Sequence, residues 1–458
     1  NTRQASAKPL RLSDPRLIGS QDLSTHVVSR YAAMNLDNRI TQRRAIEALR
    51  AGVPNRDAVL ALGCTQPAIE EKFRQQLQSV KQGVVDGSKT QGMLVEGAFG
   101  AGKSHLLEYL QHLVLQENFI CSKVVISKET PLYDPVKLYR GAAEAAIVPG
   151  KRGDALTEIA TTLDFNSRTY ADLYQWINRP GADLNSRFAA TLFLFERMRN
   201  HPELSNRIIR FWSGEQIGVS EIKRYLRACR ETVTYRIDKI PSRELALQRF
   251  KFASRLIIAA GYAGWVLLID EVELLGRYSL MQRAESYAEL ARWMGKLEEA
   301  NFTGLTAVLA ITDDFQSAIL ESREDLEKVP GKLRARASEA DILLASQAER
   351  GMRIIQRERT PLKGPDDTVL RQTYDKVRSI HAEAYDWEPP PASSVERLGT
   401  TRMREYVKGW ITEWDLKRHY PGYNVEIEVT KLRQDYTEDR NLEVATEEDS
   451  WTVNPDQG

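Results

Sequence analysis

Residues 97–104 read Gly97-Ala98-Phe99-Gly100-Ala101-Gly102-Lys103-Ser104, the G-x-x-x-x-G-K-S pattern of a phosphate-binding loop. Its glycines allow backbone N–H groups to close around phosphate oxygens. Lys103 can reach the β- and γ-phosphates, and the Ser104 hydroxyl can ligate Mg²⁺. We therefore predict that this loop, together with the adjoining His105, binds a nucleoside triphosphate and Mg²⁺.

The sequence around the loop has the strand, loop and helix order that this motif requires. The apolar run 92–96 precedes it and is typical of a short strand. Apolar residues then recur at helical spacing after it, namely Leu106, Leu107, Leu110, Leu113 and Val114. A glycine loop that opens a helix is an anion site, so this context disfavours a chance match in a surface loop.

A second motif lies far downstream, where the apolar run 265–269 ends in Asp270 and Glu271. A short apolar run suits a buried parallel strand, and ligands in such folds lie at the carboxyl ends of strands. We expect Asp270 to support Mg²⁺ and Glu271 to polarise the attacking water. The alternative, that the two acids only cap the next helix, is weaker beside the glycine loop. No Asn-Lys-x-Asp guanine-reading motif occurs, which favours ATP over GTP.

Length and composition indicate a globular chain of two or three domains. It has 458 residues, of which 42% are hydrophobic and 28% charged, and a net charge of +1 that gives no global case for nucleic-acid binding. Three scattered cysteines without a CxxC pair argue against a disulfide or zinc framework. The longest apolar stretch, 256–269, is too short and interrupted to span a membrane, and no signal peptide is evident. We expect a cytoplasmic protein with no membrane association.

The charge is unevenly distributed along the chain. Residues 421–458 contain ten Asp or Glu and three Lys or Arg, which leaves a balance of +8 in residues 1–420. A solvated tail or linker is the expected meaning of this acidic C-terminal segment, and a docking peptide is the alternative.

Strand patterns that alternate with helical ones predict an α/β fold with a parallel sheet flanked by helices. Strands are expected at 92–96, 122–127, 265–270, 305–311 and 340–345. The predicted organisation is a polar segment at 1–20, an N-terminal helical region at 21–88, a P-loop ATPase core at 89–350 with a helical insertion at about 140–255, a helical lid at 351–420 and the acidic segment at 421–458.

The order of these parts resembles the AAA+ superfamily of ATPases over residues 90–420. The resemblance implies that Thr312 is a sensor of the γ-phosphate, although a simple strand-ending threonine is equally compatible with the sequence. It also implies that Arg334 or Arg336 is an arginine finger supplied to a neighbouring subunit in a homo-oligomer. A solvated basic turn is the alternative for that pair. Either Arg402 or Arg404 at the start of a lid helix resembles a second sensor, and the spacing leaves open which one.

A closer resemblance is to the BREX phage-defence ATP-binding proteins of the BrxD type. It rests on the segment 46–55, which reads Ile-Glu-Ala-Leu-Arg-Ala-Gly-Val-Pro-Asn, on the loop segment 96–105, and on 131–135, which reads Pro-Leu-Tyr-Asp-Pro. The resemblance implies a cytoplasmic ATPase that works beside a helicase-like or other defence-system partner. It implies no particular substrate, and the long insertion departs from a minimal AAA+ core.

Two functional hypotheses follow from these features. The first is an ATP-hydrolysing motor or switch that acts on DNA or on a DNA-processing partner. The second is an ATP-gated loader or scaffold with little hydrolysis. A small-molecule kinase is weaker, because nothing marks an acceptor pocket. The basic residues between Arg350 and Lys363 could contact nucleic-acid phosphates, although a solvated helix face is the favoured interpretation.

Overall fold

The computed structural model describes residues 37–179, 184–231, 234–298, 302–392, 402–422 and 435–442. The polar segment predicted at 1–20 and the end of the acidic segment at 443–458 lie outside these residues. Six strands form a single sheet in the order β3-β2-β4-β5-β1-β6, and β3 is the antiparallel strand. Their bounds are β1 (Met93–Glu96), β2 (Ile120–Val125), β3 (Ala146–Ile147), β4 (Trp265–Asp270), β5 (Leu305–Ile311) and β6 (Arg359–Pro361). The chain thus has the mixed α/β architecture that its sequence predicts.

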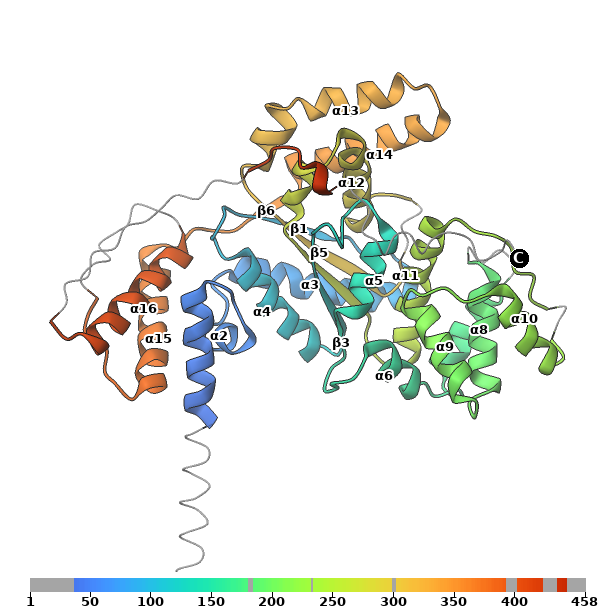
Figure 1. Cartoon of the computed structure of the whole chain (residues 1–458), viewed down its shortest axis with the longest axis horizontal. Helices are drawn as coiled ribbons and strands as arrows, with labels where there is room; N and C mark the ends of the chain where they lie inside the picture. Colours follow the sequence, from blue (N-terminus) through green and yellow to red (C-terminus); the bar gives the residue numbers. More distant parts are fainter. Residues whose placement is uncertain are drawn as a thin grey trace, which may run out of the picture.

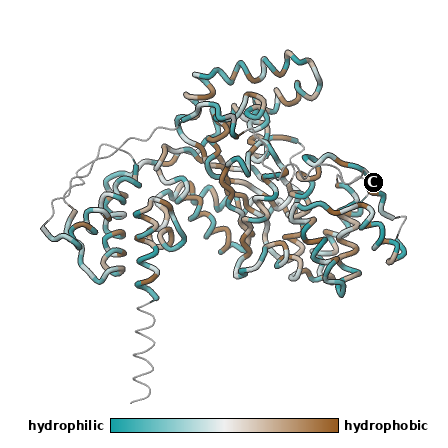
Figure 2. Tube along the Cα trace, viewed as in Figure 1, coloured by the Kyte–Doolittle hydropathy of each residue, from teal (hydrophilic) through white to brown (hydrophobic). Residues whose placement is uncertain are grey.

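The sheet separates two layers of helices because alternate residues of each strand point to opposite faces. On one face, Val266 and Leu268 of β4 share a core with α3 (Pro67–Asp86) and α4 (Lys103–Gln116). On the other face, Leu267 and Ile269 pack with helices that come from both the insertion and the second half of the chain. Figure 2 shows these central strands as the most hydrophobic part of the molecule.

The prediction of a strand at 340–345 is wrong, because these residues lie in α14 (Glu339–Arg357). The Ser338 side chain caps this helix by accepting a hydrogen bond from the Asp341 N–H. Ile342 and Leu343 are 49% and 54% exposed, so the apolar run does not supply the two buried faces of an inner strand. Helix α14 instead forms a hairpin with α13 (Asp325–Arg334) at the top of Figure 1, and the edge strand is β6.

The insertion between β3 and β4 is helical and packs directly onto the sheet. Its helices, with α5 before it, are α5 (Pro135–Glu144), α6 (Ala155–Thr162), α7 (Arg168–Ile177), α8 (Ser186–Arg197), α9 (Pro202–Ser213), α10 (Val219–Ala228) and α11 (Ser242–Ala259). Phe250 of α11 lies 5.6 Å from Trp265 of β4, measured between ring centroids. The same core cluster continues from the sheet into α8 and α9, so the insertion and the sheet form one unit.

The N-terminal region and the lid share a third core beside the sheet (Figure 1). Residues 37–51 are helical and are followed by α2 (Arg56–Leu62), while the lid consists of α15 (Asp367–Tyr385) and α16 (Met403–His419). Ile46 packs in the same cluster as Val377 and Trp410. Across this interface, Nη2 of Arg50 lies 2.6 Å from Oδ2 of Asp415. The N-terminal region and the lid, far apart in the sequence, therefore meet in space.

The remaining elements lie between β4 and α13 or follow the lid helix α16. They are the 3₁₀ helix η1 (Val272–Arg277), α12 (Leu280–Trp293), the π-helical turn η2 (Gln316–Glu321) and the short η3 (Arg440–Leu442). In the part of the chain that the structure describes, no helix has the length and apolar character needed to cross a membrane.

Candidate nucleotide-binding site

The predicted phosphate-binding loop joins β1 to α4. Gly100 and Gly102 have φ angles of 82° and 105°, in the left-handed region that favours glycine. Gly102 is the N-cap of α4 and provides no side-chain cap, so the first N–H groups of the helix face the loop without a side-chain partner. A left-handed loop that leads into an uncapped helix N-terminus is suited to a phosphate group.

The Lys103 ammonium folds back into its own loop. Its Nζ donates a hydrogen bond of 2.8 Å to the Gly97 carbonyl oxygen and lies 3.7 Å from Oε1 of Glu273. The residue is only 8% exposed. The cationic group at the centre of the loop is thus held in place by two acceptors that a phosphate could replace.

Asp270 and Glu271 lie at the carboxyl end of β4. Asp270 is buried, and its Oδ1 accepts a hydrogen bond of 3.0 Å from the Glu271 N–H. Glu271 has φ 57° and ψ 35°, a strained conformation for a residue with a side chain. Burial against the surrounding protein raises the pKa of Glu271, and the Asp270 charge raises it further. Such a carboxylate is a stronger base than an ordinary surface glutamate.

Glu273, which the sequence analysis did not identify, lies beside Lys103. It is 4% exposed, and its Oε2 has no hydrogen-bond partner among the described residues. Burial raises the pKa of Glu273 to about 7, although Lys103 acts in the opposite direction. The only sequence signal for this group was an acid two positions beyond Glu271. The sequence does not show that this side chain is buried beside Lys103.

A pocket of about 480 Å³ brings these groups together, a volume within the usual range for small-molecule sites. Its polar end is formed by the loop from Phe99 to His105 with Asp270, Glu271 and Glu273. Its apolar end lies between the N-terminal region and the lid, and is lined by Leu49, Gly52, Val53, Pro54, Met403 and Val407. The predicted nucleotide motifs thus form the polar end, and the segment 49–54 contributes to the apolar end.

His105 also lines the pocket, and its ring is fixed from the other side. Its Nε2 lies 3.0 Å from the Gly63 carbonyl oxygen, and burial lowers its pKa. A neutral imidazole anchored to Gly63 adds no charge to the phosphate end. We infer that His105 connects the loop to the N-terminal region through this contact.

The two candidate sensor arginines of the lid differ in their surroundings. Arg404 lines the pocket, and its guanidinium carbon lies 5.3 Å from the Phe99 ring centroid. Arg402 is 3.5 Å from Oε1 of Glu405. A Cβ atom on Gly100 would lie 3.8 Å from side-chain atoms of both arginines, so the start of α16 rests on the phosphate-binding loop.

Thr312 directly follows β5, the strand between β1 and β4, and is 2% exposed. Its hydroxyl oxygen lies 2.7 Å from the hydroxyl oxygen of Tyr436 in the acidic C-terminal segment. Sequence patterns gave no indication of this contact, because 124 positions separate the two residues.

The candidate finger residues Arg334 and Arg336 lie at the end of α13, outside the pocket of their own chain. Arg334 forms an ion pair of 2.8 Å with Glu349, and Arg336 is 3.8 Å from Asp341. Both side chains are more than half exposed. The site within one chain is therefore formed without them.

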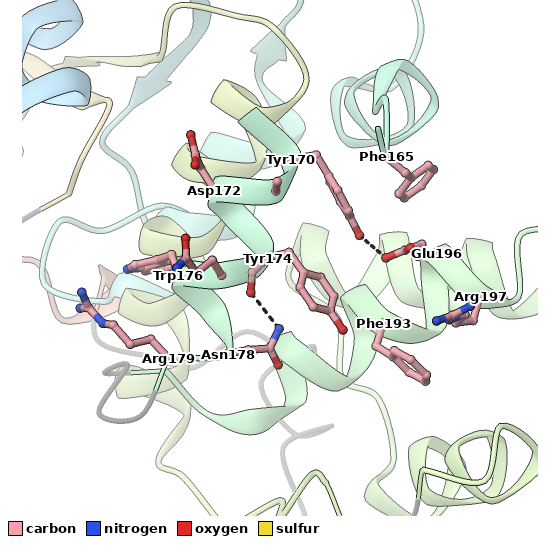
Figure 3. Close-up of a pocket in the computed structure, with 12 residues that line it drawn as sticks. Phe165, Tyr170, Asp172, Tyr174, Trp176, Asn178, Arg179, Phe193, Glu196 and Arg197 are labelled. Atoms are coloured by element: carbon pink, nitrogen blue, oxygen red, sulfur yellow. Dashed lines mark hydrogen bonds between the residues drawn. The ribbon is translucent and has the colours of Figure 1, made fainter. Parts of the chain in front are cut away.

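A second pocket lies in the helical insertion, between α7 and α8 (Figure 3). Tyr170 points across it and donates a hydrogen bond of 2.8 Å to Glu196. Two of its aromatic rings are covered by cations, since Arg199 lies over Phe165 and Arg255 over Trp176. It contains none of the residues predicted for nucleotide binding.

Comparison with known proteins agrees with this geometry. No curated protein and no solved structure matches the chain. A family profile described as BREX system ATP-binding protein BrxC/D matches residues 38–412, which include the N-terminal region, the loop, β4 and most of the lid. This extent confirms the family resemblance seen in the sequence: the chain belongs to the BREX system ATP-binding protein BrxC/D family.

Proposed function

We propose that this ATP-binding protein hydrolyses ATP and works as an AAA+-type switch. The observation that carries the proposal is the convergence of Lys103, Asp270 and Glu271 on one pocket, although 167 positions separate the loop lysine from the first acid of the pair. Lys103 would hold the β- and γ-phosphates, and Glu271 would take a proton from the attacking water. The raised pKa of Glu271 supports this role as a base.

The residues available for Mg²⁺ are the Ser104 hydroxyl and the Asp270 carboxylate, both of which line the pocket. Hard oxygen donors of this type fit Mg²⁺, which keeps several water and phosphate ligands. No cluster of three or more His, Cys, Asp or Glu with metal-binding geometry occurs among the described residues. When bound, the ion supplies charge neutralisation at the phosphates.

The sheet order supports the AAA+-type arrangement. Strand β5 separates the loop strand β1 from β4, and this places Thr312 between the two nucleotide motifs. The pocket also joins the loop to the shared core of the N-terminal region and the lid. A bound nucleotide would fix the position of that core relative to the sheet, which is the physical basis for a switch.

The target of the switch is proposed to be DNA or a DNA-processing partner, such as a helicase-like protein of the same defence system. Family membership supports a partner in that system. The exposed Arg334 and Arg336 are proposed to complete the site of a neighbouring copy in a homo-oligomer. Particle mass measured with ATP tests this, because a strict monomer would leave both arginines without a catalytic role.

The central test compares Glu271→Gln with the wild type. The variant keeps the shape of the side chain but not its basicity, so ATP binding should be retained while phosphate release falls about 100-fold or more. Glu71→Gln, on the exposed face of α3, is the matched control and should behave as the wild type. Equal turnover in Glu271→Gln and the wild type would refute hydrolysis by this site. Negligible turnover in the wild type, with or without duplex DNA, would favour the ATP-gated loader or scaffold.

A further inference from the structure

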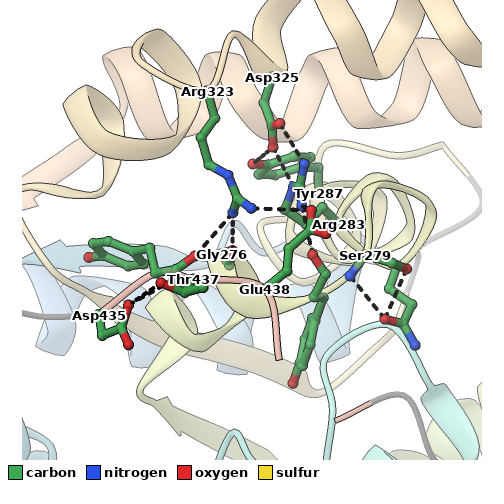
Figure 4. Close-up of polar contacts among 12 residues, drawn as sticks. Gly276, Ser279, Arg283, Tyr287, Arg323, Asp325, Asp435, Thr437 and Glu438 are labelled. Carbon is green, nitrogen blue, oxygen red and sulfur yellow. Dashed lines mark hydrogen bonds and ion pairs between the residues drawn. The ribbon is translucent and has the colours of Figure 1, made fainter. Parts of the chain in front are cut away.

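The acidic C-terminal segment returns to the ATPase core. Residues 435–442 lie against η1, α12 and the turn before α13, which are more than 100 positions earlier in the sequence (Figures 1 and 4). The prediction of a solvated tail is therefore wrong for these residues, and the alternative of a docking peptide describes them. We name residues 435–442 the C-terminal latch.

Three arginines of the core bind the acids of the latch. Nη1 of Arg283 lies 2.9 Å and Nη2 of Arg323 3.1 Å from Oε1 of Glu438. Nη2 of Arg277 lies 2.8 Å from Oδ2 of Asp439. The hydrogen bond from Arg283 holds the pKa of Glu438 below its usual value. The negative charge of the latch therefore complements the positive charge of the surface that it contacts.

The receptor for the latch is held in place by contacts within the core itself. The Arg283 side chain is 5% exposed, and its Nε donates a hydrogen bond of 2.8 Å to the fully buried Asp325. Tyr287 donates a further hydrogen bond to the same carboxylate (Figure 4). Because Asp325 fixes the guanidinium, little side-chain entropy is lost when Glu438 docks.

Tyr436 brings the latch to Thr312 at the end of β5. Its ring contacts Phe315 with the ring centroids 6.0 Å apart, and a Cβ atom on Gly276 would lie 2.9 Å from the ring. Its hydroxyl oxygen lies 2.7 Å from Thr312 and 2.7 Å from Oδ1 of Asp314. The absence of a side chain at Gly276 therefore lets the ring reach Thr312.

The protons available to these hydroxyl groups determine what the contact does to Thr312. A tyrosine hydroxyl has one proton, and Tyr436 donates it to the Asp314 carboxylate. The contact between Tyr436 and Thr312 must then use the threonine proton. With the latch docked, Thr312 can accept a hydrogen bond but has no proton left to donate. A γ-phosphate oxygen is an acceptor only, so docked Thr312 cannot bind it.

We propose that the C-terminal latch is a built-in brake that competes with the γ-phosphate for the Thr312 hydroxyl. The proposal rests on the proposed ATPase function and on the γ-phosphate sensor role that the AAA+ resemblance implies for Thr312. Docking lowers the preference of the site for ATP over ADP, since ADP has no group that requires Thr312. Release of the latch frees the threonine proton. In the chain, the latch follows the lid helix α16, which ends at His419.

The test measures equilibrium dissociation constants for ATP and ADP in the full chain without hydrolysis, at low temperature and with the Glu271→Gln change as background. Tyr436→Phe keeps the ring and removes the hydroxyl. It should strengthen ATP binding about threefold to tenfold relative to ADP, the usual magnitude for one hydrogen bond. Tyr420→Phe, at an exposed site just beyond α16, should leave the ratio unchanged. An unchanged or smaller ratio of ATP to ADP affinity in Tyr436→Phe would overturn the proposal.

Two further variants separate the brake from a general effect on the fold. Glu438→Gln combined with Asp439→Asn weakens the ionic anchor without touching Thr312, and should reproduce the effect of Tyr436→Phe. In a Thr312→Val background, Tyr436→Phe should have no further effect, because the competing group is gone. An equal effect with and without Thr312 would refute the mechanism. Loss of hydrolysis in every form would defeat the proposed function, while the binding ratios would still decide the brake.

Discussion

The Nζ atom of Lys103 lies 3.7 Å from Oε1 of Glu273, so the lysine of the phosphate-binding loop is paired with a buried acid of the next motif. The pair links the two nucleotide motifs directly, since Glu273 belongs to η1 and Lys103 opens α4. Phosphate would take the place of this acid as the partner of the lysine. The protonation state of Glu273 therefore affects both the stability of the fold and nucleotide binding.

Glu273 should make the stability of the nucleotide-free protein depend on pH. Its folded pKa of about 7 lies above the usual value of 4.5, so the folded chain binds more protons than the unfolded chain between these values. Stability is then lost as the pH rises from 4.5 to 7. As the pH rises from 5 to 8, the unfolding free energy of Glu273→Gln should increase by on the order of 2 kcal/mol relative to that of the wild type. Thermal or denaturant unfolding at both pH values measures the difference.

The control for this experiment is Glu71→Gln, since Glu71 is an exposed helical glutamate. The difference in unfolding free energy between this variant and the wild type should be nearly the same at pH 5 and pH 8. If the unfolding free energies of the wild type and Glu273→Gln change by the same amount between pH 5 and pH 8, then Glu273 does not titrate in this range.

Arg404 should contribute more to ATP binding than Arg402. Arg404 lines the pocket and lies over Phe99, whereas Arg402 is directed to Glu405. Removal of a cation that faces phosphate loses a charge-assisted interaction, so Arg404→Ala should weaken ATP binding about tenfold or more. Arg402→Ala is the matched neighbour, and titration of both variants with ATP gives the comparison. A larger loss in Arg402→Ala would reverse the assignment of the lid sensor.

Local chemistry made part of this structure predictable. The loop 97–104 and the apolar runs that became β1, β4 and β5 follow from backbone preferences and short-range periodicity. The run 340–345 was misassigned because a short apolar stretch suits a helix face as well as a strand. The Ser338 cap, which favours the helix over the strand, lies outside the run.

Long-range contacts explain what the sequence did not reveal. The pairing of Lys103 with Glu273 depends on β1 and β4 lying in the same sheet with β5 between them. The contact between Tyr436 and Thr312 depends on where a distant segment docks. Likewise, the apolar end of the pocket forms because the N-terminal region and the lid share a core. None of these contacts produces a periodic pattern or a fixed spacing in the sequence.

Asp415 should hold the lid to the N-terminal region in a pH-dependent manner. Burial acts to raise its pKa, but hydrogen bonds from His381 and Arg50 outweigh burial and lower it. The stabilisation is present above the unfolded pKa of 3.8 and is lost as the pH falls through the folded value. Asp415→Asn should cost about 1–2 kcal/mol at pH 7, and the cost should decrease as the pH falls below 3.8.

Unfolding at pH 7 and at pH 3 tests this prediction. Asp386→Asn is the control, because Asp386 is 83% exposed at the end of α15 and asparagine tolerates its left-handed backbone. A deficit in Asp415→Asn that persists unchanged to pH 3 would mean that the carboxylate charge is not what stabilises the lid.

Two helical glycines should respond in opposite directions to the same substitution. Gly351 of α14 faces α12, and a Cβ atom there would overlap the carbonyl oxygen of Tyr287. That atom is backbone, so the two helices must separate, and Gly351→Ala should destabilise the protein by about 2 kcal/mol or more. A Cβ atom on Gly331 of α13 would meet no other atom within 4 Å, so Gly331→Ala should gain about 0.5–1 kcal/mol from helix propensity. Denaturant unfolding of both variants measures the contrast, and a stabilised Gly351→Ala protein would refute the close packing of α12 on α14.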